Sequence, residues 1–142
     1  MKFSLNFTTD YGQFYLNDKD AGDTGSEDFW SDEALNDKLA VEKGILGISI
    51  ENSEGIVKCE LEILNSKSLI SDFSDFDHVV EASLEIKTGF LQINDCPFSN
   101  LVLEEKIEIG IYRVRVYFKN LESAYSENPE DFYKIEIWKD IF

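Results

Sequence analysis

Residues 78–121 read HVVEASLEIKTGFLQINDCPFSNLVLEEKIEIGIYRVRVYFKNL, and this stretch decides the fold. Apolar residues take alternate positions in it, which is the period of a β-strand with one buried face. They are Val80, Ala82, Leu84 and Ile86, then Ile107, Ile109 and Ile111, and then Tyr112, Val114, Val116 and Phe118. Gly89 and Gly110 interrupt the pattern where a turn or bulge needs the freedom in φ that glycine allows. We therefore predict about three or four strands lying side by side here.

The same alternation recurs outside this stretch, in residues 2–8, 13–16, 44–50, 57–63 and 133–137. Turn-rich segments separate these runs at the spacing typical of a two-sheet stack. We expect the first two runs to pair as a hairpin. The next two are expected to pair through the turn at residues 52–55 (NSEG).

One short helix is expected over residues 31–41. Ser31 can cap this helix, and Asp32 and Glu33 favour its positively polarised first turn. The predicted fold class is therefore all-β: an antiparallel β-sandwich of about eight strands with one short α-helix. Residues 1–142 are expected to form it as a single domain.

The charge balance of the chain is strongly acidic. Asp and Glu total 29 against 13 Lys and Arg, which gives a formal net charge of −16. Such a surface repels nucleic acid and anionic lipid, since binding either requires basic side chains. It attracts a basic protein and speeds the encounter with it, although acidity can also serve solubility alone. We predict a basic protein partner, and neither nucleic acid nor a membrane.

Cysteine usage and the start of the chain bear on the compartment. Cys59 and Cys96 are the only cysteines, too few for a disulfide framework. The first residues run straight into a strand pattern without the apolar segment of a signal peptide. We therefore expect a cytoplasmic protein.

Two acidic loops are the candidates for a partner-binding surface. The first, residues 17–28, reads NDKDAGDTGSED and is followed by Trp30, and the second, residues 66–77, reads SKSLISDFSDFD. We predict partner contacts by Asp18, Asp20, Asp23, Glu27, Asp28 and Trp30, and in second place by Asp72, Asp75 and Asp77. Trp30 could instead pack back on the sheet, and the two phenylalanines of the second loop could form a small core beneath it.

The first loop also allows a calcium interpretation, since calcium prefers oxygen ligands. The helix-loop-helix calcium pattern does not fit, because Gly22 and Asp23 stand transposed and Phe29 occupies the position of the bidentate Glu. Calcium-binding β-sandwiches also gather aspartates on loops. The alternative function is therefore a small-ligand or calcium-binding β-sandwich module, while the main prediction includes no metal and no cofactor.

Catalytic motifs are not found in the sequence. His78 is the only histidine, and no known motif sets a nucleophile or an orienting carboxylate beside it. Cys96 follows Asp95, whose charge opposes thiolate formation. We predict that the protein is not an enzyme.

The only two arginines, Arg113 and Arg115, are two residues apart in one strand and point to the same face. We expect them to neutralise carboxylates across the sheet, such as those at residues 104–108 or Glu136. The functional alternative is a bidentate clamp on a carboxylate ligand.

A further pattern extends over most of residues 2–138. It consists of Trp30-Ser31-Asp32-Glu33-Ala34 leading through a short helix to Gly44, then Gly47-Ile48-Ser49-Ile50, the strand at residues 57–63, Val79-Val80-Glu81-Ala82 before Thr88-Gly89, and Gly110-Ile111-Tyr112-Arg113-Val114. This order resembles the competence protein J family, small bacterial proteins that inhibit a DNA-degrading nuclease of the DNA-uptake system. It also resembles bacterial immunity-type β-sandwich proteins that protect against contact toxins. The longer acidic loop at residues 17–28 and the extended C-terminal end depart from the pattern.

The resemblance and the charge point to the same class of function. We expect an acidic inhibitor or immunity-type protein that binds a basic partner, a nuclease or a toxin, and blocks it sterically and electrostatically.

Overall fold

The computed structural model describes residues 1–21, 29–98 and 100–140. In these ranges the chain forms ten strands, one short α-helix and one 3-10 helix. The strands are β1 (Lys2–Thr8), β2 (Gln13–Asp18), β3 (Leu39–Glu42), β4 (Ile45–Ser49), β5 (Ile56–Leu64), β6 (His78–Ile86), β7 (Phe90–Asp95), β8 (Leu101–Lys106), β9 (Gly110–Lys119) and β10 (Phe132–Lys139), and the helices are α1 (Asp32–Asp37) and the 3-10 helix η1 (Leu121–Tyr125). No helix in the described ranges is long and apolar enough to cross a bilayer.

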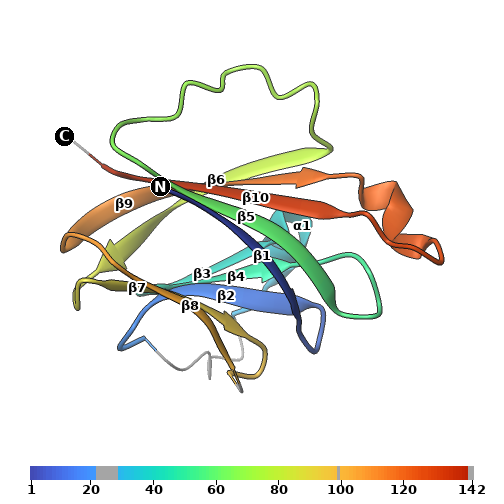
Figure 1. The fold of residues 1–142 in the computed structure, drawn as a ribbon, viewed down its shortest axis with the longest axis horizontal. Helices are drawn as coiled ribbons and strands as arrows, with labels where there is room; N and C mark the ends of the chain where they lie inside the picture. Colours follow the sequence, from blue (N-terminus) through green and yellow to red (C-terminus); the bar gives the residue numbers. More distant parts are fainter. Residues whose placement is uncertain (22–28, 99, 141–142) are drawn as a thin grey trace.

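The strands form two five-stranded sheets that pack face to face (Figure 1). Sheet A has the order β1-β5-β10-β9-β6, and sheet B has the order β3-β4-β2-β7-β8. The predicted all-β sandwich is confirmed, with ten strands in place of about eight. The strands are not all antiparallel as predicted, because β10 runs parallel to β5, with Ile135 opposite Leu61. β10 runs antiparallel to β9 and lies between β9 and β5. Because β5 also runs antiparallel to β9, β5 and β10 are parallel neighbours.

Side chains from the facing sides of the two sheets fill the core, as the alternation predicts. In β10, for example, Tyr133, Ile135 and Ile137 are buried in the main cluster between the sheets. From sheet B, Phe14 and Leu16 meet them, and the Phe14 and Tyr133 rings contact edge to face with centroids 6.5 Å apart. Burying each such side chain contributes about 1.5–3 kcal/mol, so this cluster is the main source of stability.

Both predicted hairpins are wrong. β1 pairs with β5 in sheet A, whereas β2 pairs with β4 and β7 in sheet B. The chain therefore changes sheets between β1 and β2 and again between β4 and β5. The two connections lie against each other, because the Thr9 amide donates to the Gly55 carbonyl at 2.8 Å. A Cβ on Gly55, whose φ is +75°, would lie 2.1 Å from the Thr9 oxygen, so this approach requires glycine.

The strands of residues 78–121 do not all lie side by side as predicted. β6 pairs with β9 in sheet A, while β7 and β8 form a hairpin in sheet B. The alternation identifies these strands correctly. It reports which face of each strand is buried, and carries no information on which sheet the strand joins.

The helix is shorter than predicted. Ser31 caps it as expected, its hydroxyl accepting from the Ala34 amide at 3.2 Å. The helix ends at Asp37, because Lys38 adopts a left-handed conformation with φ of 59°. Residues Leu39–Glu42, expected to be helical in part, form strand β3 instead.

Replacing Ile135 by Ala should lower the free energy of unfolding by about 2–5 kcal/mol, because it empties a fully buried position between the sheets. Urea unfolding measures the change. Ile109 is 64% exposed, so Ile109→Ala is the matched control and should change the same quantity by less than about 0.5 kcal/mol. Equal losses in the two variants would contradict the core described above.

Candidate partner-binding surface

The connection between β5 and β6, residues 65–77, crosses the outer face of sheet A, and we call it the strap. β5 ends level with Trp138, near the end of β10, whereas β6 begins level with Tyr133, near the start of β10. The strap must therefore return along the length of the sheet. Figure 1 shows it as the long connection at the top of the view.

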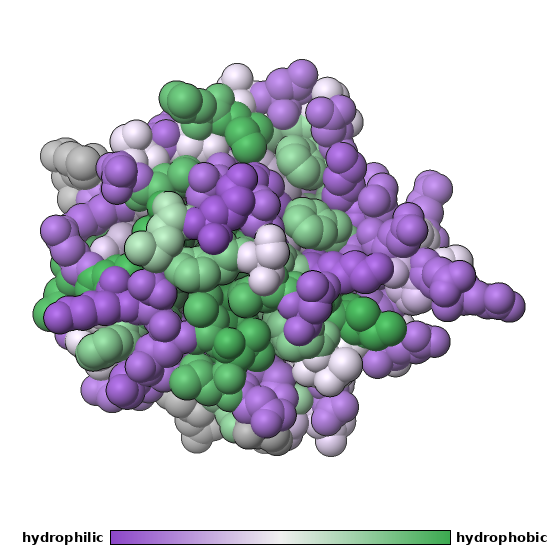
Figure 2. All heavy atoms as spheres, in the orientation of Figure 1, coloured by the Kyte–Doolittle hydropathy of each residue, from purple (hydrophilic) through white to green (hydrophobic). Residues whose placement is uncertain are grey.

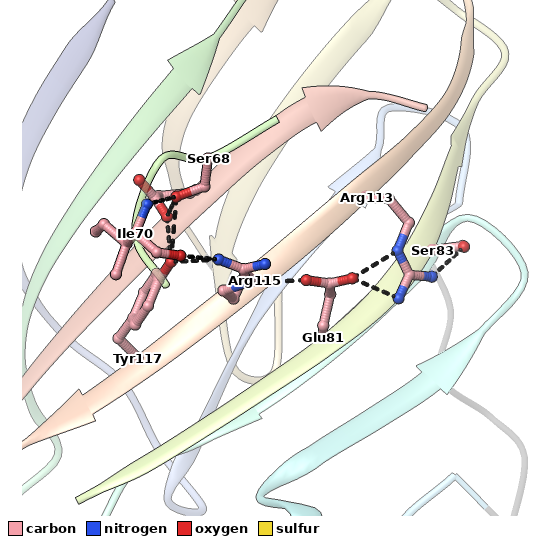
Figure 3. A network of polar contacts seen from close by, with 8 residues as sticks. Ser68, Ile70, Glu81, Ser83, Arg113, Arg115 and Tyr117 are labelled. Carbon is pink, nitrogen blue, oxygen red and sulfur yellow. Dashed lines mark hydrogen bonds and ion pairs between the residues drawn. The ribbon is translucent and has the colours of Figure 1, made fainter. Parts of the chain in front are cut away.

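The inner side of the strap is held by a polar network on the sheet (Figure 3). Glu136, only 3% exposed, accepts hydrogen bonds from the Ser68 hydroxyl at 2.7 Å and from the Tyr117 hydroxyl. Ser68 Oγ in turn accepts from the Ile70 amide at 3.1 Å. Arg115 Nη1 donates to the Ile70 carbonyl at 3.0 Å and to the Tyr117 hydroxyl at 3.1 Å. The strap is thus fixed to the sheet through the Ser68 side chain and the Ile70 carbonyl, and the Ile70 amide bonds back to Ser68 within the strap.

The network continues along the sheet to a carboxylate that both arginines share, Glu81 of β6 (Figure 3). Arg115 Nε donates to Glu81 Oε1 at 2.8 Å, and Arg113 donates to Glu81 Oε2 from Nε at 3.0 Å and from Nη2 at 2.9 Å. Arg113 Nη1 also donates to Ser83 at 2.7 Å. The arginines neutralise a carboxylate across the sheet, as expected. The carboxylate is Glu81, which was not among those named. Residues 104–108 are not reached because β9 pairs with β6 and β8 lies in the other sheet, and Glu136 accepts from Ser68 and Tyr117 instead.

Burial and hydrogen bonding act in opposite directions on the charged members of the network. Burial raises the pKa of Glu81, but the hydrogen bonds and charges of Arg113 and Arg115 outweigh it and hold that pKa below its usual value. Burial and the hydrogen bond to Glu136 raise the pKa of Tyr117. At neutral pH the network therefore contains an ionised Glu81 and a protonated Tyr117.

Aromatic side chains of the strap cover this network. The guanidinium carbon of Arg115 lies 5.2 Å from the ring centroids of both Phe73 and Trp138. Phe73 and Phe76 also contact the Tyr117 ring, with centroids 6.0 and 4.8 Å apart. The two phenylalanines thus pack on the sheet. Phe73 nevertheless keeps 39% of its surface exposed.

The outer side of the strap presents apolar and acidic groups. Leu69 is 98% exposed, and Asp72, Asp75 and Asp77 are exposed as well. A hydrogen bond from the Ser74 amide to Asp72 lowers the pKa of Asp72, which fixes its negative charge. Figure 2 shows a few hydrophobic side chains among hydrophilic ones at the top of the view, where Figure 1 places the strap.

The end of the strap borders an open hollow of about 550 Å³, which we call the acidic hollow. Asp77, Asn120, Glu122, Ser123 and Glu130 line it, and no Lys or Arg of the described chain is among them. Asp77 is fixed there, because its amide donates to the Phe118 carbonyl and its carboxylate accepts from the Leu121 amide at 2.9 Å. This end of the molecule lies at the right in Figure 1, and Figure 2 shows it as hydrophilic.

Of the aspartates predicted for the first loop, Asp18 and Asp20 do not join this surface. Asp18 is buried, and its carboxylate accepts from the Lys87 amide at 3.0 Å and from the Thr88 amide and hydroxyl at 3.2 and 2.5 Å. It holds the turn after β6 and is not available to a partner, which corrects its assignment as a contact residue. Asp20 is exposed and lies near Asp18, beside Glu85 and Lys87 at the end of β6. Asp77 precedes the start of β6, so the length of this nine-residue strand, about 30 Å, separates Asp20 from Asp77. Asp23, Glu27 and Asp28 lie outside the described residues.

Trp30 packs back on sheet B. Its indole Nε1 donates to Gln13 Oε1 at 2.6 Å, and its ring contacts that of Phe29 with centroids 5.8 Å apart. A Cβ on Gly47 would come within 3.0 Å of the indole, so β4 leaves room for it. Trp30 was expected either to contact a partner or to pack on the sheet. The structure shows the packing, and the sheet is not the one that carries the strap.

Two of the residues lining the acidic hollow, Glu122 and Glu130, were missed by sequence reasoning. Their charges are plain in the sequence, but they stand about 50 residues from Asp77. Only the pairing of β6 with β9 brings the three together. Leu69 was missed for another reason: no local pattern distinguishes an exposed leucine from a buried one in an irregular segment.

The described residues show no arrangement of side chains typical of catalysis or of metal binding. His78 Nε2 lies 2.6 Å from the Asp37 carbonyl, to which it must donate. Burial raises the pKa of the Cys96 thiol, which disfavours the reactive thiolate. No group of three potential ligands that could hold a metal ion occurs in the part of the chain that the structure describes.

Comparisons with known proteins relate the chain to others by fold. No family model and no curated protein matches it. Among solved structures it is similar to ComJ, inhibitor of the DNA degrading activity of NucA, from Bacillus subtilis, with 16% identity and a TM-score of 0.72 over 99% of this chain and 96% of that one. It is also similar to the structure named crocagin biosynthetic gene J, with 18% identity and a TM-score of 0.59 over 99% of both chains. The predicted resemblance to competence protein J is thus confirmed for the fold, which is all that such low identities show.

Replacing Glu81 by Gln should lower the free energy of unfolding at pH 7 by about 1–3 kcal/mol, because two guanidiniums lose their common carboxylate. The pKa of Glu81 is lower in the folded state than its ordinary value of 4.5. Its contribution is therefore complete above that value and is lost as the pH falls through the lowered one. The stability gap between wild type and variant should narrow in urea unfolding series from pH 7 down to pH 3.

The exposed Glu127 provides the control for this experiment. Glu127→Gln makes the same change of charge without a paired arginine, so its effect should stay within about 0.5 kcal/mol at pH 7. A gap for Glu81→Gln that does not change with pH would contradict the role given to the arginine pair.

Proposed function

We propose that this protein is an inhibitor of a basic, DNA-degrading nuclease, which it binds and blocks without turnover. The observation that supports this most is the acidic hollow, a cluster of carboxylates with no basic residue among those that line it, on a fold shared with an inhibitor of a DNA-degrading activity. The formal net charge of −16 supports the same choice of partner.

The physical basis is the chemistry of the target. A nuclease holds its DNA through basic side chains that replace the counterions of the phosphates. Carboxylates placed at the spacing of a surface hollow can pair with those side chains and exclude the nucleic acid. Long-range attraction between the acidic end and a basic cleft also raises the association rate, by 10- to 1,000-fold at low salt in steered complexes.

The position of Asp77 favours binding over a passive role in solubility. Its carboxylate is oriented by the Leu121 amide and its backbone by the Phe118 carbonyl, whereas a solubilising charge needs no orientation. A fixed carboxylate loses little conformational entropy on binding, so more of its interaction energy is realised as affinity.

A nuclease inhibition assay tests the proposal directly. DNA-degrading nucleases from the organism that carries this gene, beginning with any similar to NucA, would be purified and their degradation of plasmid DNA measured with and without the protein. We expect one of them to be inhibited at least tenfold at equimolar protein, with inhibition weakening as salt rises from 50 to 500 mM. If none of these nucleases is inhibited at about 10 μM protein, a concentration at which even weak, transient complexes form, the function is rejected.

Neutralising the hollow should slow association with the inhibited nuclease. The triple variant Asp77→Asn, Glu122→Gln, Glu130→Gln removes three carboxylates, and its association rate at low salt should fall about tenfold, as surface plasmon resonance would show. The control triple Asp20→Asn, Glu33→Gln, Glu105→Gln removes three charges elsewhere and should change the rate less than about twofold. Equal effects of the two triples would mean that total charge matters and the hollow does not.

A further inference from the structure

The strap presents an apolar side chain on a fixed backbone. Leu69 is 98% exposed, yet the residues on both sides of it are held: Ser68 by its hydrogen bond to Glu136, and Ile70 through its amide and its carbonyl. A single exposed leucine is ordinary on protein surfaces. Leu69 differs, because hydrogen bonds fix the residues before and after it. A second apolar side chain, the partly exposed Phe73, lies four residues further along the strap.

The way in which the strap is held does not serve stability efficiently. Arg115 is 8% exposed and Glu136 is 3% exposed, so both charges lose most of their hydration. Buried charges of this kind are often replaceable by apolar side chains without loss of stability. What hydrogen bonds add, and apolar packing does not, is direction: they fix where the Ile70 carbonyl and amide point. Arg115 and Glu136 therefore act as positioning residues for Leu69.

Charge links the strap to the acidic hollow. Asp77 belongs to both, and Asp72 and Asp75 continue the exposed acidic groups along the strap towards Leu69. The strap and the hollow thus form one continuous surface, apolar at Leu69 and Phe73 and anionic from Asp72 to the hollow, while the exposed Lys67 lies on the other side of Leu69. A surface of this composition matches a basic protein with an apolar depression beside its cationic groups.

We infer that the strap is the apolar anchor of the nuclease interface. Leu69, with the exposed edge of Phe73, enters an apolar depression of the basic partner, and Asp72 and Asp75 pair with cationic side chains around it. The inference rests on the proposed function and deepens it, by separating two roles. The hollow governs the association rate, and the strap governs how long the complex lasts, because rim charges act mainly on association and buried contacts mainly on dissociation.

Surface plasmon resonance with the inhibited nuclease distinguishes the two roles. For Leu69→Ser we expect a dissociation rate about tenfold higher, an unchanged association rate and an unchanged urea midpoint, since the side chain is exposed in the free protein. Leu101→Ser is the matched control, an exposed leucine in β8 of the other sheet, and should dissociate as wild type does. A wild-type dissociation rate for Leu69→Ser overturns the inference.

Arg115→Lys tests the positioning role. Lysine keeps the charge but cannot reach Glu81 and the Ile70 carbonyl together, as the guanidinium does. We expect faster hydrogen exchange at residues 66–76 than in wild type while β9 and β10 stay protected, and a higher dissociation rate. In the double variant with Leu69→Ser the two effects on dissociation should not add, because both act through the same side chain. Full additivity would overturn the positioning role.

Failure of the inference and failure of the proposed function give different results. If the hollow triple loses association rate while Leu69→Ser binds as wild type does, the inhibitor function stands and the anchor is rejected. If no nuclease is inhibited by the wild-type protein, the proposed function fails and the inference fails with it.

Discussion

The direction of two strands determines how this surface is built. β5 and β6 run the same way in sheet A with β10 and β9 between them, so the chain must return outside the sheet. A returning segment without regular structure has backbone groups that need partners. The sheet supplies some of them: Arg115 donates to the Ile70 carbonyl, the Phe118 carbonyl accepts from the Asp77 amide, and Glu136 holds the Ser68 side chain. The topology therefore explains why charged side chains are buried on a face that would otherwise be an ordinary solvated one.

The same pairing places distant segments together. Because β6 lies beside β9, the last residue of the strap, Asp77, meets the end of β9 and the connection that follows it: its amide donates to Phe118 of β9 and its carboxylate accepts from the Leu121 amide. Residues 65–77 and 120–130 thus form one surface, although neither segment is a strand. The sandwich supplies rigidity, and the connections supply the groups that a partner can reach.

Sequence reasoning went as far as local periodicity allows. It identified most strands, their buried faces and the Ser31 cap, since each depends on neighbouring residues. Strand partners escaped it: the alternation of residues 2–8 and 13–16 is compatible with one sheet or two, and the contact of Thr9 with Gly55, where the chain changes sheets, joins residues 46 positions apart in the sequence. Asp18 shows the same limit for the site, because its composition suits a loop while its carboxylate is satisfied by amides 69 and 70 residues away.

The distribution of positive charge bears on how the acidic end acts. Lys134 on sheet A pairs with Glu60 and Glu62, and Arg113 and Arg115 pair with Glu81, so much of the scarce basic charge is used on that face. The carboxylates of the hollow are left without such partners among the residues that line it. Added salt screens exposed charges far more than partly buried pairs. Rising ionic strength should therefore weaken the attraction between the hollow and a cationic partner, while the network under the strap persists. The position of the apolar side chains on the strap should then not depend on salt.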